Sequence, residues 1–225
     1  GPGMYWKAAD GTGQVERLSQ GEALPYAWSA DGRLIFEQEG DIGALTMEGE
    51  RTVEMLLDGD FQESAPALSP DGRWLAYMSN ETGDTLTYVQ PYPNIDDGQW
   101  RVSPVAGGYP VWSPDGKWIA HWEGVEMIHM SKFTGISNPK RDQMIASTFH
   151  VWVVGSDGKN RRKAGRGDDP TWSPDGFVTR AFPDPRRGGP IVMVESASGD
   201  KALPIVPPRR NWGRFTWVPL ESQKP

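Results

Sequence analysis

The stretch W-S-P-D-G-K-W-I-A-H-W, from Trp112 to Trp122, decides the fold because its first five residues recur along the chain. Related stretches are WSADG from Trp28, LSPDG from Leu68 and WSPDG from Trp172. In S-P-D-G the proline presets the backbone for a tight turn, Ser and Asp bond nearby amides, and Gly accepts the conformation that follows. Apolar or aromatic residues flank the turns, so each copy predicts a β-hairpin.

A second pair of strand-like runs follows each hairpin, so the repeating unit has four strands. The turns are spaced from 28 to 68, from 68 to 112 and from 112 to 172, which is 40, 44 and 60 residues. A four-stranded repeat of about 40 to 45 residues indicates the blades of a β-propeller. The longer third interval predicts an insertion at about 123–146.

The two ends of the chain predict how the ring closes. Residues 4–18 look like the last two strands of a unit, and residues 214–218 look like the first strand of another. Pairing them would leave no long exposed sheet edge. We therefore predict an all-β propeller of four-stranded antiparallel blades, with five blades closed between the N-terminal strands and the C-terminal strand. Six blades, or an excised part of a larger propeller, are the alternatives. The propeller domain is expected over 4–220, after an expression scar at 1–3 and before a tail at 221–225.

Composition excludes several classes of function. The chain has 23 basic and 30 acidic residues, a net charge of −7, and no cysteine. An acidic protein has no broad positive field for a phosphate backbone, so no nucleic acid partner is expected. The lack of cysteine excludes disulfides and thiolate sites. No apolar run approaches the roughly 20 residues of a membrane helix, so no membrane insertion is expected. A monomer is expected.

The repeats resemble a known family. SPDGRWLAYMSNETG from Ser69, TYVQPYP from Thr87 and WSPDGKWIA from Trp112 resemble the repeats of TolB-like, WD-like propellers. WKAADGTGQVERL from Trp6, together with the middle portion of the chain to about residue 116, is similar to the propeller repeats found behind bacterial serine/threonine kinase domains. The resemblance implies a propeller with a partner-binding or sensor role, in a periplasmic or other extracytoplasmic compartment. A few relatives of this kind are lyases, but no catalytic residue can be carried over from the motif.

Loops gather at one face of a propeller, and we place the candidate binding residues there. The aromatic and arginine side chains of this face could form a binding hot spot for a protein or peptide partner. The carboxylates of this face, with Glu22, could instead hold a hard cation such as calcium, although solvated loop acids are the preferred interpretation and no cofactor is expected. The candidate binding residues are Tyr109, Trp212, Arg214, Glu63, Asp168 and Asp169.

The histidines suggest a second kind of site. His121, His129 and Glu123 have the side chains that zinc or manganese takes as ligands. Their spacing matches no compact metal motif, so packed or exposed histidines are the preferred interpretation. The repeated Asp of each turn is expected to form hydrogen bonds within its own turn and not to belong to a carboxylate site. A basic cluster between 159 and 166, which includes Arg161, is assigned to a solvated turn.

These observations predict a non-catalytic binding scaffold that presents a loop-rich face to a protein or peptide. The alternative is a small carbohydrate-active hydrolase or lyase, metal-assisted in one version, with its site at the mouth of the channel. No nucleophile elbow, phosphate loop or H-E-x-x-H pattern accompanies the repeats.

Overall fold

The computed structural model describes residues 2–124, 149–184, 189–196 and 202–205, and within them every sheet is antiparallel. Four of the sheets have four strands, and one has two strands, β1 (Tyr5–Trp6) and β2 (Glu16–Arg17). The described residues contain no α-helix, and a 3-10 turn, η1, spans Ile95–Asp97. No helix among these residues is long and apolar enough to cross a membrane.

Each four-stranded sheet is one blade, and its strands follow one another in chain order. Blade 1 contains β3 (Leu24–Trp28), β4 (Arg33–Gln38), β5 (Asp41–Thr46) and β6 (Val53–Leu57). Blade 2 contains β7 (Glu63–Leu68), β8 (Trp74–Ser79), β9 (Leu86–Pro91) and β10 (Trp100–Arg101). Blade 3 contains β11 (Gly107–Trp112), β12 (Trp118–Glu123), β13 (His150–Gly155) and β14 (Arg162–Arg166). Blade 4 contains β15 (Asp168–Trp172), β16 (Phe177–Asp184), β17 (Gly189–Ser196) and β18 (Ala202–Ile205).

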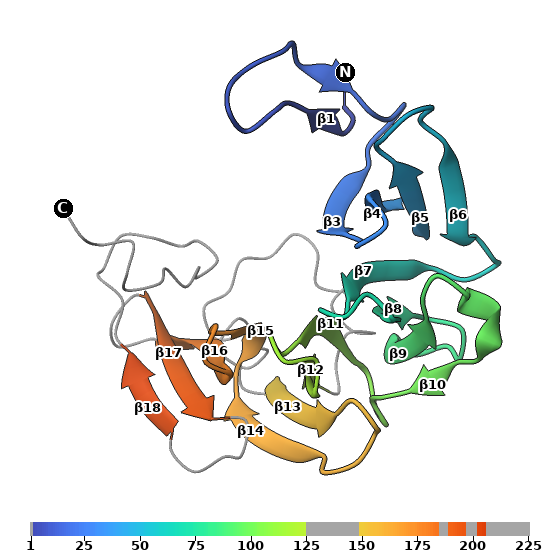
Figure 1. Ribbon diagram of the computed structural model, residues 1–225. Helices are drawn as coiled ribbons and strands as arrows, with labels where there is room; N and C mark the ends of the chain where they lie inside the picture. Colours follow the sequence, from blue (N-terminus) through green and yellow to red (C-terminus); the bar gives the residue numbers. More distant parts are fainter. Residues whose placement is uncertain (1, 125–148, 185–188, 197–201, 206–225) are drawn as a thin grey trace, which may run out of the picture.

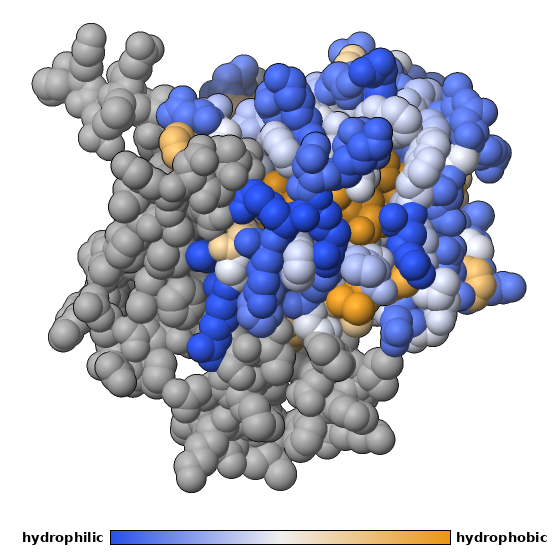
Figure 2. All heavy atoms as spheres, turned by 90° about the horizontal axis from the view of Figure 1, so that it is seen from below, coloured by the Kyte–Doolittle hydropathy of each residue, from blue (hydrophilic) through white to orange (hydrophobic). Residues whose placement is uncertain are grey.

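The blades follow one another around an arc, with the first strand of each blade on its inner side (Figure 1). Neighbouring inner strands contact one another, β3 with β7, β7 with β11, and β11 with β15. Seen from below, the described residues present mostly hydrophilic side chains around a recessed hydrophobic strip (Figure 2). The arrangement places the apolar faces of the sheets between the blades, where each blade packs against the next.

The repeated turn joins the first two strands of each blade. In blade 2 the Ser69 amide donates to the Trp74 carbonyl, and the Ser69 hydroxyl donates to the Asp71 carboxylate at 2.6 Å. Ser113 and Asp115 repeat that side-chain bond at 2.6 Å in blade 3. The assignment of the repeated aspartates to turn chemistry is therefore confirmed at these positions.

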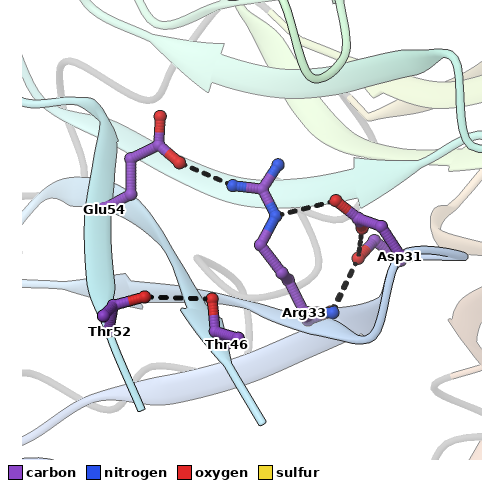
Figure 3. A network of polar contacts seen from close by, with 6 residues as sticks. Asp31, Arg33, Thr46, Thr52 and Glu54 are labelled. Carbon is purple, nitrogen blue, oxygen red and sulfur yellow. Dashed lines mark hydrogen bonds and ion pairs between the residues drawn. The ribbon is translucent and has the colours of Figure 1, made fainter. Parts of the chain in front are cut away.

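In blade 1 the turn also carries an ion-pair network (Figure 3). The Arg33 guanidinium bonds Asp31 through Nε at 3.0 Å and Glu54, in β6, through Nη1 at 2.6 Å. Its Cζ also lies 5.2 Å from the centre of the Tyr92 ring, which belongs to blade 2. The Arg33 side chain therefore connects the turn after β3, the last strand of blade 1 and the neighbouring blade.

Buried clusters between the blades form the core. Ile35 and Ile42 of blade 1 pack with Leu75 and Tyr77 of blade 2, and Ala76 of blade 2 packs with Ile119 of blade 3. Hydrogen bonds reinforce this packing, because the indole of Trp112 donates to the Ala67 carbonyl at 3.0 Å and that of Trp172 to the Val111 carbonyl at 3.1 Å. Each bond joins one blade to the blade before it.

The predicted all-β fold of four-stranded antiparallel blades is confirmed. Closure of the ring would use residues 214–218, which lie outside the described residues, so it stays a prediction, as does the domain boundary at 4–220. The predicted insertion at 123–146 falls between the end of β12 at Glu123 and the start of β13 at His150. Nearly all of it lies outside the described residues.

Candidate functional site

A β-bulge interrupts the inner strand of each blade. In blade 3, Gly108 pairs with Trp122 and Val111 with Ala120, so Tyr109 and Pro110 together face one residue of β12. Blades 2 and 4 have the same register shift, between Ser64 and Ala67 and between Asp168 and Thr171. Bulges bend a strand and redirect its side chains, and they often adjoin binding sites.

The residue at the bulge has a left-handed backbone in three blades. The φ angles of Ala65, Tyr109 and Asp169 are 51°, 50° and 46°, a region that non-glycine residues rarely adopt. A proline follows each of them in the sequence, and proline is tolerated at a bulge on an edge strand because it has no amide to donate. Such strain is often found where a structure positions a binding residue. We call residues 63–65, 107–109 and 167–169 the inner rim.

Tyr109 is the exposed aromatic residue of the inner rim, with 46% of its surface accessible. Its ring centre lies 6.4 Å from that of Trp122, and Trp122 meets Phe149 edge to face at 4.8 Å. Its amide donates to the Met78 sulfur of blade 2 at 3.2 Å. Trp122 and Phe149 are both buried, so Tyr109 is the outward end of a row of rings held by two blades.

Glu63 begins β7 and is buried, with 6% of its surface accessible. Its Oε1 accepts a hydrogen bond from the Ser79 hydroxyl at 2.9 Å, while its buried Oε2 has no hydrogen-bond partner among the described residues. Burial raises the pKa of the Glu63 carboxyl, the bond from Ser79 opposes this rise, and the charges of Asp41 and Glu81 add to it. Glu63 is therefore a packed acid of the inner rim and is not a solvated loop residue.

The two predicted aspartates lie at the start of the inner strand of blade 4. Asp168 begins β15, and its backbone pairs with Ala181. Asp169 follows at the bulge and is exposed, so it occupies the position that Tyr109 has in blade 3. Tyr109 and Asp169 thus lie at matching points of neighbouring inner strands, which contact each other.

His121 and Glu123 lie two residues apart on one face of β12 and bond to each other. The His121 Nε2 is 2.9 Å from the Glu123 Oε1, and the imidazole is fully buried. Burial, helped by the charge of Arg161, lowers the pKa of His121 to about 3, so the ring is neutral near pH 7. A neutral imidazole beside a carboxylate donates through Nε2, which leaves Nδ1 as a buried acceptor with no partner among the described residues.

Arg161 completes this group from the end of the turn before β14. Its guanidinium bonds the Glu123 Oε2 and lies 3.6 Å from the centre of the Trp152 ring. Trp152 pairs with His121 across β12 and β13, so all four side chains share one face of blade 3. Burial raises the pKa of Glu123 and the bond and charge of Arg161 oppose this rise. Arg161 is therefore not one of the solvated basic side chains of its turn.

Two of the three predicted metal ligands lie among the described residues. His121 and Glu123 are brought together, and His129 lies outside the described residues. Within the described ranges, no group of three or more His, Cys, Asp or Glu side chains is arranged to hold a metal ion. The predicted metal site and the predicted calcium site with Glu22 and Glu63 stay predictions. Trp212 and Arg214 of the predicted binding set also lie outside the described residues.

Several site residues were not singled out by the sequence analysis. Trp122 and Phe149 support Tyr109, and Met78 holds its amide from another blade. Trp122 lies just after the repeated motif, in a run of residues whose pattern predicts a buried strand. The pattern does not predict which aromatic ring Trp122 contacts. Arg161 and Glu123 were both named from the sequence, but their contact was not predicted, because they are 38 residues apart and only the pairing of three strands brings them together.

The fold and its repeated inner bulges define a β-propeller built from four-stranded antiparallel blades. Solved structures similar to the chain include TolB from Acinetobacter baumannii, at 18% identity over 87% of this chain and 46% of that one, with a TM-score of 0.58. An oligogalacturonate lyase in complex with manganese is similar at 10% identity over 84% of this chain and 55% of that one, also with a TM-score of 0.58. A chain of a nidogen and laminin complex is similar at 12% identity over 80% of this chain and 62% of that one, with a TM-score of 0.54.

These likenesses establish a TolB-like propeller fold, and at such low identity they establish the fold alone. No family model matches the chain, and no curated protein matches its sequence. The chain spans 46%, 55% and 62% of the three similar structures, which is less than two thirds of each. The neighbours include both an enzyme and a protein complex, so the function has to be argued from the site.

Proposed function

We propose that this chain is a non-catalytic binding scaffold whose inner rim binds a protein or peptide, with Tyr109 as the main contact. The observation that carries the proposal is the exposed Tyr109 ring on a left-handed bulge, supported by two buried aromatic rings. Tyrosine is enriched among the residues that dominate binding energy at protein interfaces.

The rigidity of Tyr109 favours binding. Its amide donates to the Met78 sulfur of blade 2, and Gly108 beside it packs against the same side chain, because an added Cβ would come closer than 3.0 Å to the Met78 sulfur and would require Met78 to shift. A ring that is already ordered loses little conformational entropy when a partner covers it. Asp169 at the matching point of blade 4 adds a negative charge beside Tyr109, so the proposed partner has apolar and basic groups close together.

The test is the affinity of peptides selected from a random library against the wild-type protein. We expect Tyr109→Ala to weaken binding by about 30-fold or more, the effect of losing an interface residue that contributes about 2 kcal/mol. Tyr109→Phe should retain most of the affinity, because the ring and its packing remain.

The matched control is Phe177→Ala. Phe177 is 42% exposed, similar to Tyr109, but it begins β16 directly after a turn. Its removal should change affinity by less than about twofold. Equal affinity of the wild type and Tyr109→Ala for every selected peptide would contradict the proposal.

The alternative function is a carbohydrate-active hydrolase or lyase, with or without a metal. It draws support from the likeness in fold to an oligogalacturonate lyase in complex with manganese. The His121 Nε2 and both Glu123 oxygens, however, are occupied by each other and by Arg161. Turnover of oligogalacturonate by protein purified without chelator, with a stoichiometric divalent ion in elemental analysis, would favour the enzyme over the scaffold.

The proposal includes a location and an assembly state. We place the chain in the periplasm or another extracytoplasmic compartment, as a monomer without a resident cofactor. The support is the TolB-like sequence motif and fold. The similarity of residues 6–18 to kinase-associated repeats suggests a sensor appendage as one setting for such a scaffold. Fractionation of cells that make the native protein tests the location.

A further inference from the structure

The most basic stretch of the sequence, residues 159–166, continues from a turn into the outer strand of blade 3. It reads K-N-R-R-K-A-G-R, with five basic residues and no acid, in a chain whose net charge is −7. Elsewhere in the sequence, no run of eight residues holds more than three basic residues. Since β14 spans Arg162–Arg166 and lies on the outer side of the arc (Figure 1), most of this charge is on a strand and not in a solvated turn.

A bulge in β14 places two of these cations on one face of the sheet. Lys163 pairs with Trp152 and Arg166 with His150, and the register shifts between these pairs. Trp152 and His150 are two residues apart on β13, so their side chains lie on the same face. The extra residue of the bulge brings Lys163 and Arg166, which are three apart, to that same face. Both are exposed at the edge of the blade.

The exposed cations of this stretch have no acid to neutralise them. Arg161 is taken by the buried Glu123 and by the ring of Trp152. Among the residues that the structure describes, no carboxylate forms an ion pair with Lys159, Lys163 or Arg166. Like charges held close together repel one another, so this arrangement carries a cost that a bound acid would remove.

Protection of the sheet edge does not account for this much charge. Charged side chains on an edge strand prevent unwanted pairing with other chains. The other outer strands carry far fewer of them, because β6 has Glu54 alone, β10 has Arg101 alone and β18 has no charged residue. One charge or none is therefore enough at the other edges, and the cluster on β14 calls for a different explanation.

We propose that the outer edge of β14 binds an extended acidic segment of a partner protein, which adds a fifth strand to blade 3. β14 is the last strand of its sheet, so no described strand pairs with its outer side, and such an edge is a template for strand addition. Acidic residues at alternate positions of the added segment lie on one face, where they meet Lys163 and Arg166.

The net charge favours a protein segment over a membrane or a nucleic acid. Anionic lipid surfaces and phosphate backbones attract proteins through a broad positive field, and a chain with a net charge of −7 opposes both. A short added strand needs only the local cations and the backbone groups of one edge. This surface is distinct from the inner rim, so the inference is independent of the proposed function at Tyr109.

The test is the binding of a fluorescently labelled peptide, T-E-V-E-V-E-T, to the full chain, measured by anisotropy. We expect saturable binding below about 1 mM, and backbone amides of β14 that exchange about tenfold more slowly at saturation. The matched peptide T-E-P-E-P-E-T keeps every glutamate but lacks amides at its prolines, so it should bind at least about tenfold more weakly. No binding of the first peptide, or equal affinity of the two, would overturn strand addition.

A charge-reversal variant identifies the surface. Lys163→Glu combined with Arg166→Glu should weaken peptide binding by about tenfold or more, because both cations become repulsive. Arg101→Glu combined with Lys117→Glu is the control: it changes two exposed basic residues and the net charge equally, and it should alter the affinity by less than about threefold. Equal losses in the two variants would overturn the assignment to β14. Binding to vesicles of phosphatidylcholine and phosphatidylglycerol that only the first variant abolishes, without binding of the peptide, would assign the surface to a membrane and also overturn the proposal.

Discussion

At the scale of single residues, the two acids Glu63 and Glu123 show how burial changes a prediction. The sequence offers Glu63 as a binding candidate on the loop-rich face and Glu123 as a candidate metal ligand, and both are buried, at 6% and 4% exposure. Glu123 has Arg161 and His121 as partners, whereas Glu63 has one hydroxyl and the charges of other acids nearby. Their residue types could be read from the sequence, but Ser79, which bonds Glu63, and Arg161, which bonds Glu123, come from other parts of the blade.

The raised pKa of Glu63 predicts a pH-dependent effect of Glu63→Gln. Because the folded pKa lies above the ordinary 4.5, the buried charge costs stability as pH rises from that value through the folded pKa. Glutamine cannot ionise, so the stability of the variant relative to wild type should increase as pH rises from about 4 to 8. Denaturant unfolding of both proteins across this range measures the difference.

The control for this prediction is Glu22→Gln, because Glu22 is an exposed acid. As an exposed surface substitution, it should change the free energy of unfolding at pH 7 by less than about 0.5 kcal/mol. A Glu63→Gln difference that falls as pH rises would show that the Glu63 charge stabilises the fold, contrary to the burial argument.

At the scale of elements, the four-stranded blades were predictable and the bulges were not. The repeated S-P-D-G turn predicts two strands around it, and the structure confirms them, for example β11 and β12 around Pro114. The pairs Ala65-Pro66, Tyr109-Pro110 and Asp169-Pro170 mark the bulges in the sequence. Proline within a strand suggests an irregular edge, but the left-handed φ of the residue before it depends on the partner strand.

The bulged strand of blade 3 predicts a strong effect of Gly107→Ala. An added Cβ at Gly107 would come closer than 3.0 Å to the Trp122 carbonyl oxygen, and backbone in the middle of a sheet cannot move aside cheaply. We expect a loss of about 1–3 kcal/mol in the free energy of unfolding, measured by urea titration. Gly59→Ala is the control, because nothing lies within 4 Å of its added Cβ, and it should change stability by less than about 0.5 kcal/mol. Equal effects of the two substitutions would contradict the steric argument.

At the scale of the whole molecule, each blade is coupled to its neighbour by a buried cluster and, at two interfaces, by an indole hydrogen bond. The order of blades was predictable from the repeat, since each unit contacts the next in the chain. The specific bonds were not, because Trp112 and Ala67 are 45 residues apart and Trp172 and Val111 are 61 apart. The motif tryptophans predict packing, and only the structure gives the acceptor.

This coupling predicts how tryptophan substitutions combine. Trp112→Phe and Trp172→Phe each remove an indole N–H and leave a carbonyl of the preceding blade without its donor, so each should cost about 1–2 kcal/mol. For a chain of this size, the melting temperature should fall by roughly 2–4 °C per kcal/mol. The two bonds lie at different blade interfaces, so the double variant should lose the sum of the single losses to within about 0.5 kcal/mol. Trp100→Phe, at an exposed position, should be close to neutral. A loss in the double variant well beyond the sum would mean that blades 2, 3 and 4 unfold as one cooperative unit whose interfaces depend on each other, in place of nearest-neighbour coupling.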